Sequence, residues 1–119
     1  MNILLVGDVS REGEAAVMNY MERHGLADVD ILKVSHHGSK NASSAEFLKL
    51  VRPRIAVISC GRKNSYGHPH EETMERLEEV GGRVFRTDEL GAIIFTLSPS
   101  VGVQGGIRAS WACEEENQL

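Results

Sequence analysis

Histidines and one aspartate are the side chains of this sequence with the clearest capacity for chemistry. Two imidazoles are adjacent in His36-His37, and two more flank a proline in His68-Pro69-His70. A carboxylate, Asp8, follows a glycine near the amino terminus. Imidazole and carboxylate groups are common protein ligands of divalent metals, and imidazole also acts as an acid or base near neutral pH. These residues therefore predict a metal or acid–base site if the fold brings them together.

Each of these residues also has a plainer structural interpretation. Asp8 could cap the helix that is predicted to follow it, although Ser10 is a competing cap. A single histidine is most often only a satisfied polar residue. Two adjacent imidazoles cannot face the same way, so one of His36 and His37 can bind a metal while the other meets substrate. His68-Pro69-His70 opens a helix, whose amino terminus either attracts an anion or is merely capped.

The elements that must position these residues alternate between strand and helix. Apolar segments predict strands at residues 3–6, 29–34 and 55–58. Amphipathic patterns with end signals predict helices at residues 11–24, 43–51 and 69–80. The second helix opens with a capping box, Ser43-x-x-Glu46, and Gly25 ends the first. This alternation indicates an α/β fold with parallel strands joined by right-handed crossovers.

The last part of the sequence follows a different pattern. Residues 83–87 and 92–97 are separated by a short polar turn and predict a closing β-hairpin. Residues 101–112 could form a last strand pair or a poorly defined tail. We therefore expect one partial domain over residues 1–98 and a poorly defined tail over residues 99–119.

The polar residues fall in the loops that follow the predicted strands. The first strand runs into Gly7-Asp8, the second into residues 35–40 and the third into residues 60–70. In an open parallel sheet, ligands bind outside the carboxyl ends of the strands. Four of the five histidines and Asp8 are thus predicted to meet at one edge, although they span more than sixty positions of sequence.

Several other kinds of site are excluded by spacing. Residues 61–67 resemble a phosphate-binding P-loop, but the second glycine comes one residue late and His68 follows it. The sequence contains neither a G-x-S-x-G nucleophile elbow nor a G-x-G-x-x-G dinucleotide motif. Cys60 could be a thiol nucleophile, but a role as a small buried apolar residue is the stronger interpretation.

Composition and charge narrow the class of protein. The chain has 119 residues, 41% of them hydrophobic and 25% charged, which is typical of one globular domain. No apolar run is long enough to span a bilayer and no basic segment opens a secretory signal, so a soluble chain is predicted. The net charge is −4, but residues 33–63 carry a net +6. This local excess suits a specific anionic ligand, or it is only a solvated face.

Four motifs in order resemble a known family. They are L-L-V-G-D (residues 4–8), L-K-V-S-H-H-G-S (32–39), I-S-C-G-R-K-N-S-Y-G-H-P-H (58–70) and R-T-D-E-L-G-A-I (86–93). Together they are similar to the later, C-terminal half of the metallo-β-lactamase-fold domain of ComEC-type DNA-uptake (competence) proteins. The ordered set is specific even though each motif alone is not. The resemblance implies an αββα sandwich, of which this chain forms the β-α-β-α-β-α part followed by a β-hairpin.

The resemblance also implies a site with divalent metals, usually zinc or manganese. Asp8 would match the aspartate that bridges two metals. His37, or else His36, would match the final histidine ligand, with its neighbour near the scissile phosphate. His36 and His68 would be the catalytic residues. The implied substrate contacts come from Ser39, Lys40, Lys63, Asn64, Tyr66 and His70.

The implied reaction is hydrolysis of a phosphodiester, such as single-stranded DNA, by metal-activated water. In the family this domain is attached to a membrane channel, outside the cytoplasmic membrane, and degrades the DNA strand that is not transported. A small-molecule phosphoester is an alternative substrate, and a non-catalytic, truncated interaction module is an alternative function.

One motif of the family has no counterpart in this sequence. The metal-binding motif H-x-H-x-D-H would precede Asp8, whereas the first predicted strand already begins at Ile3. Without that motif most metal ligands are missing, so we expect that the isolated chain does not retain the divalent metal. We therefore predict that the chain is inactive alone and needs the missing amino-terminal half-domain or a second copy.

Overall fold

A parallel sheet of four strands organises the computed structural model, which describes residues 1–98 and 106–112. The sheet has the order β1-β2-β3-β4. Its strands are β1 (Ile3–Leu5), β2 (Ile31–Lys33), β3 (Ile55–Ile58) and β4 (Arg83–Arg86). The connecting helices are α1 (Arg11–Arg23), α2 (Ala45–Val51) and α3 (Glu71–Glu79), and a short 3-10 turn, η1 (Ser35–Gly38), follows β2. The predicted alternation of parallel strands and helices is thus confirmed.

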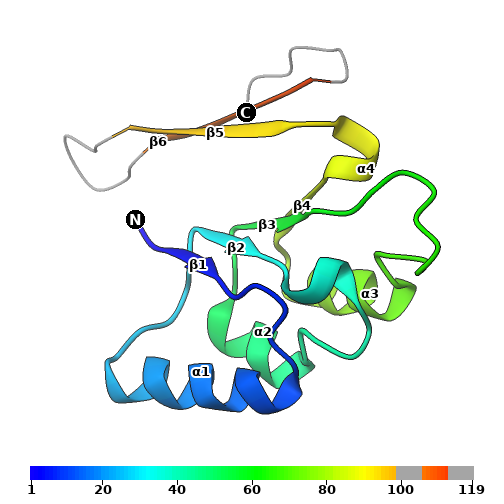
Figure 1. The fold of residues 1–119 in the computed structure, drawn as a ribbon. Coiled ribbons are helices and arrows are strands. Elements are labelled where there is room, and N and C mark those ends of the chain that lie inside the picture. Colours follow the sequence, from blue (N-terminus) through cyan, green and yellow to red (C-terminus); the bar gives the residue numbers. More distant parts are fainter. Residues whose placement is uncertain (99–105, 113–119) are drawn as a thin grey trace.

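The sheet lies between a layer of helices and a β-hairpin (Figure 1). Helices α1, α2 and α3 cover one face, and the hairpin of β5 (Ile93–Ser98) and β6 (Gly106–Trp111) crosses the other. Successive side chains of a strand point to opposite faces. Leu32 therefore packs in the helix-side core, whereas Ile31 packs in the hairpin-side core. Burial on both faces explains why the central strands β2 and β3 are almost entirely apolar.

The hairpin differs from the predicted one. Residues 83–87 and 92–97 do not pair with each other, because β4 joins β3 in parallel and β5 pairs antiparallel with β6. The prediction of that hairpin is therefore wrong. A four-residue helix, α4 (Thr87–Leu90), replaces the expected turn and carries the chain from the sheet to the second layer. Burial of Phe85 with Ile31 and Ile55 favours β4 as a strand of the main sheet.

Part of the predicted tail is a strand. Residues 106–111 form a single strand, β6, which pairs with β5, and Ala109 of this strand is buried against the sheet. The rest of the predicted tail, residues 99–105 and 113–119, lies outside the described residues. None of the helices in the described part of the chain is long and apolar enough to cross a membrane.

The start of α2 differs from the prediction by one residue, and a buried carboxylate explains the difference. Ser44, not Ser43, caps the helix, and its hydroxyl accepts a hydrogen bond from the Phe47 N–H at 3.2 Å. Glu14 of α1 is fully buried and accepts hydrogen bonds from the N–H groups of Ser43 and Ser44. This contact ties the end of the loop after η1 to α1.

Candidate functional site

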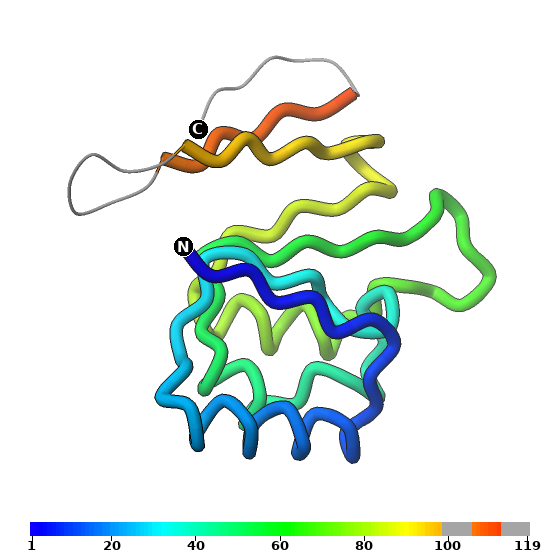
Figure 2. The backbone as a smooth tube through the Cα atoms, turned by 60° about the vertical axis from the view of Figure 1, so that its left-hand side comes forward, coloured from blue at the N-terminus to red at the C-terminus, as the bar shows by residue number. Residues whose placement is uncertain are grey.

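Three loops meet at the carboxyl edge of the parallel sheet, at the right of Figure 2. They contain residues 7–10, 35–40 and 59–70. The fully buried Ser35 hydroxyl donates to the Val9 carbonyl at 2.6 Å. The His36 N–H donates to the Gly7 carbonyl at 3.1 Å. These bonds hold the loop of Asp8 against the loop of the adjacent histidines, as the parallel order of the strands predicts.

Asp8 and His37 form a pair of metal-type donors at this edge. The Nδ1 atom of His37 donates to the Ser59 carbonyl at 2.8 Å, which leaves a lone pair on Nε2 when the ring is neutral. That Nε2 lies 3.7 Å from Asp8 Oδ1, and both side chains are exposed, by 49% for His37 and 68% for Asp8. A ring held by a backbone carbonyl, with its free nitrogen turned outward, is typical of metal-ligating histidines.

The backbone of the histidine pair adopts an uncommon conformation. His36 has φ 50° and ψ 44°, and His37 has φ 57° and ψ 23°, so both lie in the left-handed region. A side chain in this region costs about 1–2 kcal/mol, and such strain concentrates at functional sites. The two ring planes meet at 65° with their centroids 6.4 Å apart. The two rings are therefore not coplanar, and the division of metal and substrate roles between them stays a prediction.

His68 lies at the centre of a cluster of rings. Its ring centroid is 6.0 Å from that of His36, 6.2 Å from that of His37, 4.8 Å from that of His70 and 5.6 Å from that of Tyr66. Burial lowers the pKa of His68, and the three neighbouring imidazoles lower it further. The structure therefore brings the four predicted histidines together around a ring that favours the neutral form.

Asn64 and His70 organise the loop between β3 and α3. The Asn64 side chain accepts from the His68 N–H at 2.9 Å and donates to two backbone carbonyls at 3.0 and 2.7 Å. His70 accepts at Nδ1 from the Lys40 N–H at 2.9 Å and donates from Nε2 to the Tyr66 carbonyl at 3.0 Å. Both side chains thus form hydrogen bonds with backbone groups, and these bonds hold the loop in place.

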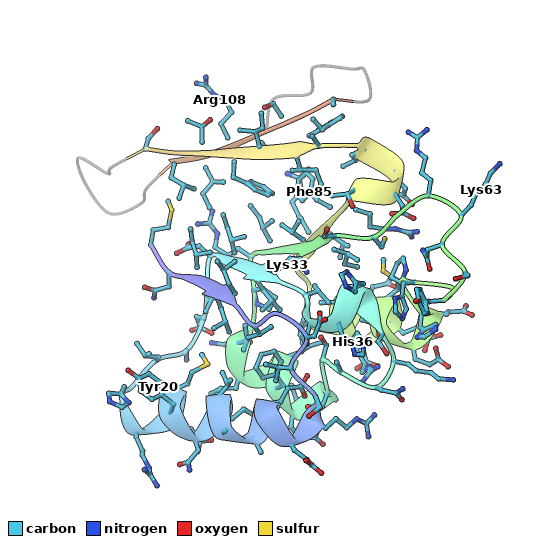
Figure 3. The ribbon with its side chains drawn as sticks, in the orientation of Figure 1. Tyr20, Lys33, His36, Lys63, Phe85 and Arg108 are labelled. Atoms are coloured by element: carbon cyan, nitrogen blue, oxygen red, sulfur yellow. The ribbon has the colours of Figure 1, made fainter. Side chains whose placement is uncertain are left out.

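The other predicted substrate residues differ in accessibility. Ser39 is only 3% exposed, and its hydroxyl accepts from the Asn41 N–H at 3.3 Å. Lys40, Lys63 and Tyr66 are exposed, and Lys63 points away from the sheet at the tip of its loop (Figure 3). These three are the members of the predicted substrate set that a ligand can reach most easily.

Sequence reasoning gave no role to Lys33, which ends β2 beside the site (Figure 3). Its Nζ donates to the Val34 carbonyl at 2.9 Å. Burial lowers the pKa of Lys33, and the Asp8 carboxylate opposes that shift, so the ammonium group and Asp8 interact. The sequence feature that could have pointed to Lys33 is its position between two apolar residues, Leu32 and Val34, at the end of a predicted strand.

A pocket opens beside the donor pair. It is lined by His37, Cys60, Gly61, Asn64, Tyr66 and His68. Burial raises the pKa of the Cys60 thiol, and a hydrogen bond to Asp88 raises it further. A raised pKa disfavours the nucleophilic thiolate, but Cys60 is only partly buried and lines the pocket, so the interpretation as a buried apolar residue is not confirmed. The pocket therefore offers imidazole, amide and phenol groups to a ligand rather than a thiolate.

The donors at this edge do not complete a metal site. Within residues 1–98 and 106–112, no group of three His, Cys, Asp or Glu side chains is arranged to hold a metal ion. Catalytic zinc sites take three protein ligands and keep one open position. Asp8 and His37 have suitable donor chemistry but are only two. Among the described residues, the pair is therefore one ligand short of such a site.

The fold and the site together define an α/β protein with histidine-rich loops at the carboxyl edge of its parallel sheet. Similar proteins include ComE operon protein 3 of Bacillus subtilis, 40% identical over 102 residues. Competence protein ComA of Neisseria gonorrhoeae is 36% identical over 107 residues, and Recombination protein 2 of Haemophilus influenzae is 37% identical over 92 residues. No family model and no solved structure matches the chain.

These similarities extend over most of the chain but over little of each relative. They cover 86%, 90% and 77% of this chain and 13%, 14% and 11% of the respective relatives. The predicted resemblance to competence proteins is therefore confirmed as sequence similarity over the aligned residues.

Proposed function

We propose that this chain supplies part of a phosphodiester-hydrolysing site of a competence protein and acts on nucleic acid during DNA uptake. The observation that carries the proposal is the Asp8–His37 pair, whose Nε2 is turned toward the carboxylate at 3.7 Å by the bond from Nδ1 to the Ser59 carbonyl. The names of two similar proteins, a ComE operon protein and a competence protein, support the biological context. The metallo-β-lactamase fold is part of the same proposal.

The residues of this edge would divide the work on a phosphodiester. Asp8 and His37 would be metal ligands, and a bound zinc or manganese ion would stabilise negative charge on the phosphate. His68 and His36 are the candidates for proton transfer, because the lowered pKa of His68 keeps that ring able to accept a proton at neutral pH. Lys40 and Lys63 would attract the backbone of the substrate by charge.

The remaining ligands would come from another stretch of polypeptide or from a second copy of the chain. The exposed side of β1 is a suitable place for such a partner. Among the described strands β1 pairs only with β2, and the exposed fractions of its side chains are 47% for Ile3 and 74% for Leu5. A strand added there would end near Asp8, which follows β1 by three residues.

Paramagnetic Mn²⁺ tests the donor pair even when binding is weak. Substoichiometric Mn²⁺ should broaden the amide and side-chain NMR signals of Asp8 and His37 first. Asp8→Asn should abolish this broadening, whereas Asp28→Asn should leave it unchanged, because Asp28 is an equally accessible acid that pairs with Arg52 elsewhere. Broadening that survives Asp8→Asn would overturn the assignment.

Genetic transformation tests the biological role. In the organism that carries this protein, Asp8→Asn and His37→Gln should each lower the frequency of transformation by added DNA, and Asp28→Asn should not. Unchanged transformation with loss of Mn²⁺ binding would favour a small phosphodiester as the substrate. Titration with an oligonucleotide and with bis(p-nitrophenyl) phosphate then separates the two substrates, and failure of both to bind would favour a non-catalytic module.

A further inference from the structure

Three rings of the site form a nearly parallel row that leads to the donor pair. Tyr66 and His68 have their ring planes at 20° and their centroids 5.6 Å apart. His68 and His37 follow with planes at 21° and centroids 6.2 Å apart. These distances and angles are those of offset-stacked aromatic pairs. Beyond His37, its Nε2 faces Asp8, so the row runs from Tyr66 to the proposed metal ligands.

Tyr66 is the open end of this row. It is 74% exposed, and one face of its ring is turned to His68, so the other face is available. The loop does not need the ring for its conformation, because Asn64 and His70 hold the backbone through their own hydrogen bonds. Tyrosine rings are enriched at binding interfaces, because they present an apolar face together with a polar hydroxyl group.

We propose that the ring of Tyr66 is a stacking platform for an unpaired nucleobase of the substrate strand. The inference rests on the proposed function, because it takes nucleic acid as the substrate, and it adds a base-binding subsite to the phosphate-binding edge. Aromatic side chains bind single strands by stacking on bases, with little dependence on sequence. In a duplex the bases stack on each other and are unavailable, so the platform selects single strands.

The spacing and charge of the surroundings fit this assignment. Two ring steps of 5.6 and 6.2 Å join Tyr66 to His37, so their rings lie at most about three to four nucleotide rises of roughly 3.4 Å apart. A base on Tyr66 would therefore place a nearby phosphate at Asp8 and His37. Lys63 is three residues from Tyr66 in the same exposed loop and would contact the intervening backbone.

Binding of oligonucleotides with and without bases separates stacking from phosphate contacts. The full chain is titrated, at low salt, against fluorescently labelled oligothymidylate and against an abasic oligonucleotide of the same length and charge. Tyr66→Ala should weaken binding of oligothymidylate by about five- to 150-fold. It should leave the abasic strand almost unaffected, and Tyr66→Phe should behave as wild type.

Tyr20→Ala is a matched control. Tyr20 is 59% exposed and stacks on His24 with centroids 4.0 Å apart, but it lies on α1, far from His36 and Lys63 (Figure 3). This variant should bind both oligonucleotides as wild type does. In addition, oligothymidylate should quench the tryptophan fluorescence of a Tyr66→Trp variant, and the abasic strand should not.

The outcomes distinguish the two proposals. Equal loss of affinity for both strands in Tyr66→Ala, or no loss for either, would overturn the stacking site while leaving phosphate binding at this edge intact. Failure of wild type to bind either strand would overturn both the stacking site and the nucleic-acid function. Weakening by Tyr20→Ala would show that tyrosines at large, and not this row of rings, carry the binding.

Discussion

Charged residues are used differently at the amino end of the parallel sheet and in the loops that follow β1 and β2 at its carboxyl end. At the amino end, Asp28 and Asp30 have close basic partners: Arg52 Nε lies 2.6 Å from Asp28, and Arg54 lies 3.0 Å from Asp30. At the carboxyl end the corresponding pair, Asp8 and His37, is 3.7 Å apart and exposed, and its histidine sits in a strained backbone. Arg86 also pairs with Asp88, at 2.7 Å, at the carboxyl end of β4, so the difference concerns the loops of Asp8 and His37, where both side chains remain exposed to a ligand.

The basic residues of segment 33–63 are divided between the two ends of the sheet. Residues 33–63 carry a net +6, but the fold sends this charge to both ends of the sheet. Arg52 and Arg54 are neutralised by aspartates at the amino end. Lys33, Lys40 and Lys63 lie at or near the carboxyl edge. Ion pairs therefore account for Arg52 and Arg54, whereas an anionic ligand for Lys33, Lys40 and Lys63 stays a prediction.

The largest effect is expected for Glu14, an acid near the carboxyl end that is structural rather than functional. It is fully buried and accepts from the N–H groups of Ser43 and Ser44. Glu14→Ala should lower the free energy of unfolding by about 3 kcal/mol, because two N–H groups lose their acceptor. Urea unfolding followed by circular dichroism measures the loss. Glu14→Gln, which keeps one acceptor, should lose less, and a loss below about 1 kcal/mol in Glu14→Ala would contradict this role.

A somewhat smaller effect is expected for Gly38, at the end of the histidine turn. Its φ is +83°, and a Cβ there would lie 2.6 Å from Pro69 Cβ. Gly38→Ala should lower the free energy of unfolding by about 2–3 kcal/mol and should shift the NMR signals of His36 and His68, because strain adds to the collision. Gly81→Ala is the control, since Gly81 has φ +76° with nothing within 4 Å of the added carbon. Equal losses in the two variants would show that the collision with Pro69 is relieved at no cost.

These two positions mark the limit of what the sequence predicts. The parallel strands and the meeting of four histidines followed from apolar segments and from the rule that loops gather at carboxyl ends. The role of Glu14 could not follow, because its partners lie 29 and 30 residues away. The orientation of His37 depends likewise on the Ser59 carbonyl, 22 residues away, and on a left-handed turn that its residue type disfavours.

The predicted hairpin failed for a related reason. A polar turn between residues 83–87 and 92–97 is a local signal, whereas the true partner of β5 is β6, beyond Ser98. Phe85 packs with Ile31 and Ile55 of other strands, which no local pattern reveals. Hydrophobic periodicity thus predicts the helices and strands well. It predicts which strands pair only where the connection between them implies the pairing, as in the strand–helix–strand units.

Strain at the carboxyl end should appear as a gain of stability when it is removed. His36→Gly should raise the free energy of unfolding by about 0.5–1 kcal/mol, because glycine adopts φ 50° without the side-chain penalty. The same variant should lose any binding that depends on His36. Arg52, at the amino end, also has a positive φ of 37°, but Arg52→Gly gives up the pair with Asp28 and should gain less. A greater gain in Arg52→Gly than in His36→Gly would remove this distinction between the two ends.

The smallest effect concerns acid pH and the amino end. The Asn2 N–H, at 2.8 Å, is the main cause that lowers the pKa of Asp30, and Arg54 lowers it further. Because the pKa of Asp30 is lower in the folded than in the unfolded chain, its contribution to stability is present above about pH 4 and is lost as the pH falls further. Asp30→Asn should therefore be less stable than wild type at pH 7, and the difference should shrink toward pH 3. Thermal unfolding at both pH values measures this difference in stability. Addition of 1 M NaCl should remove only the part of the difference that comes from the charge of Arg54. A difference that grows as the pH falls would mean that the Asp30 carboxyl is held in its protonated form, and the amino end would then not be a set of paired charges.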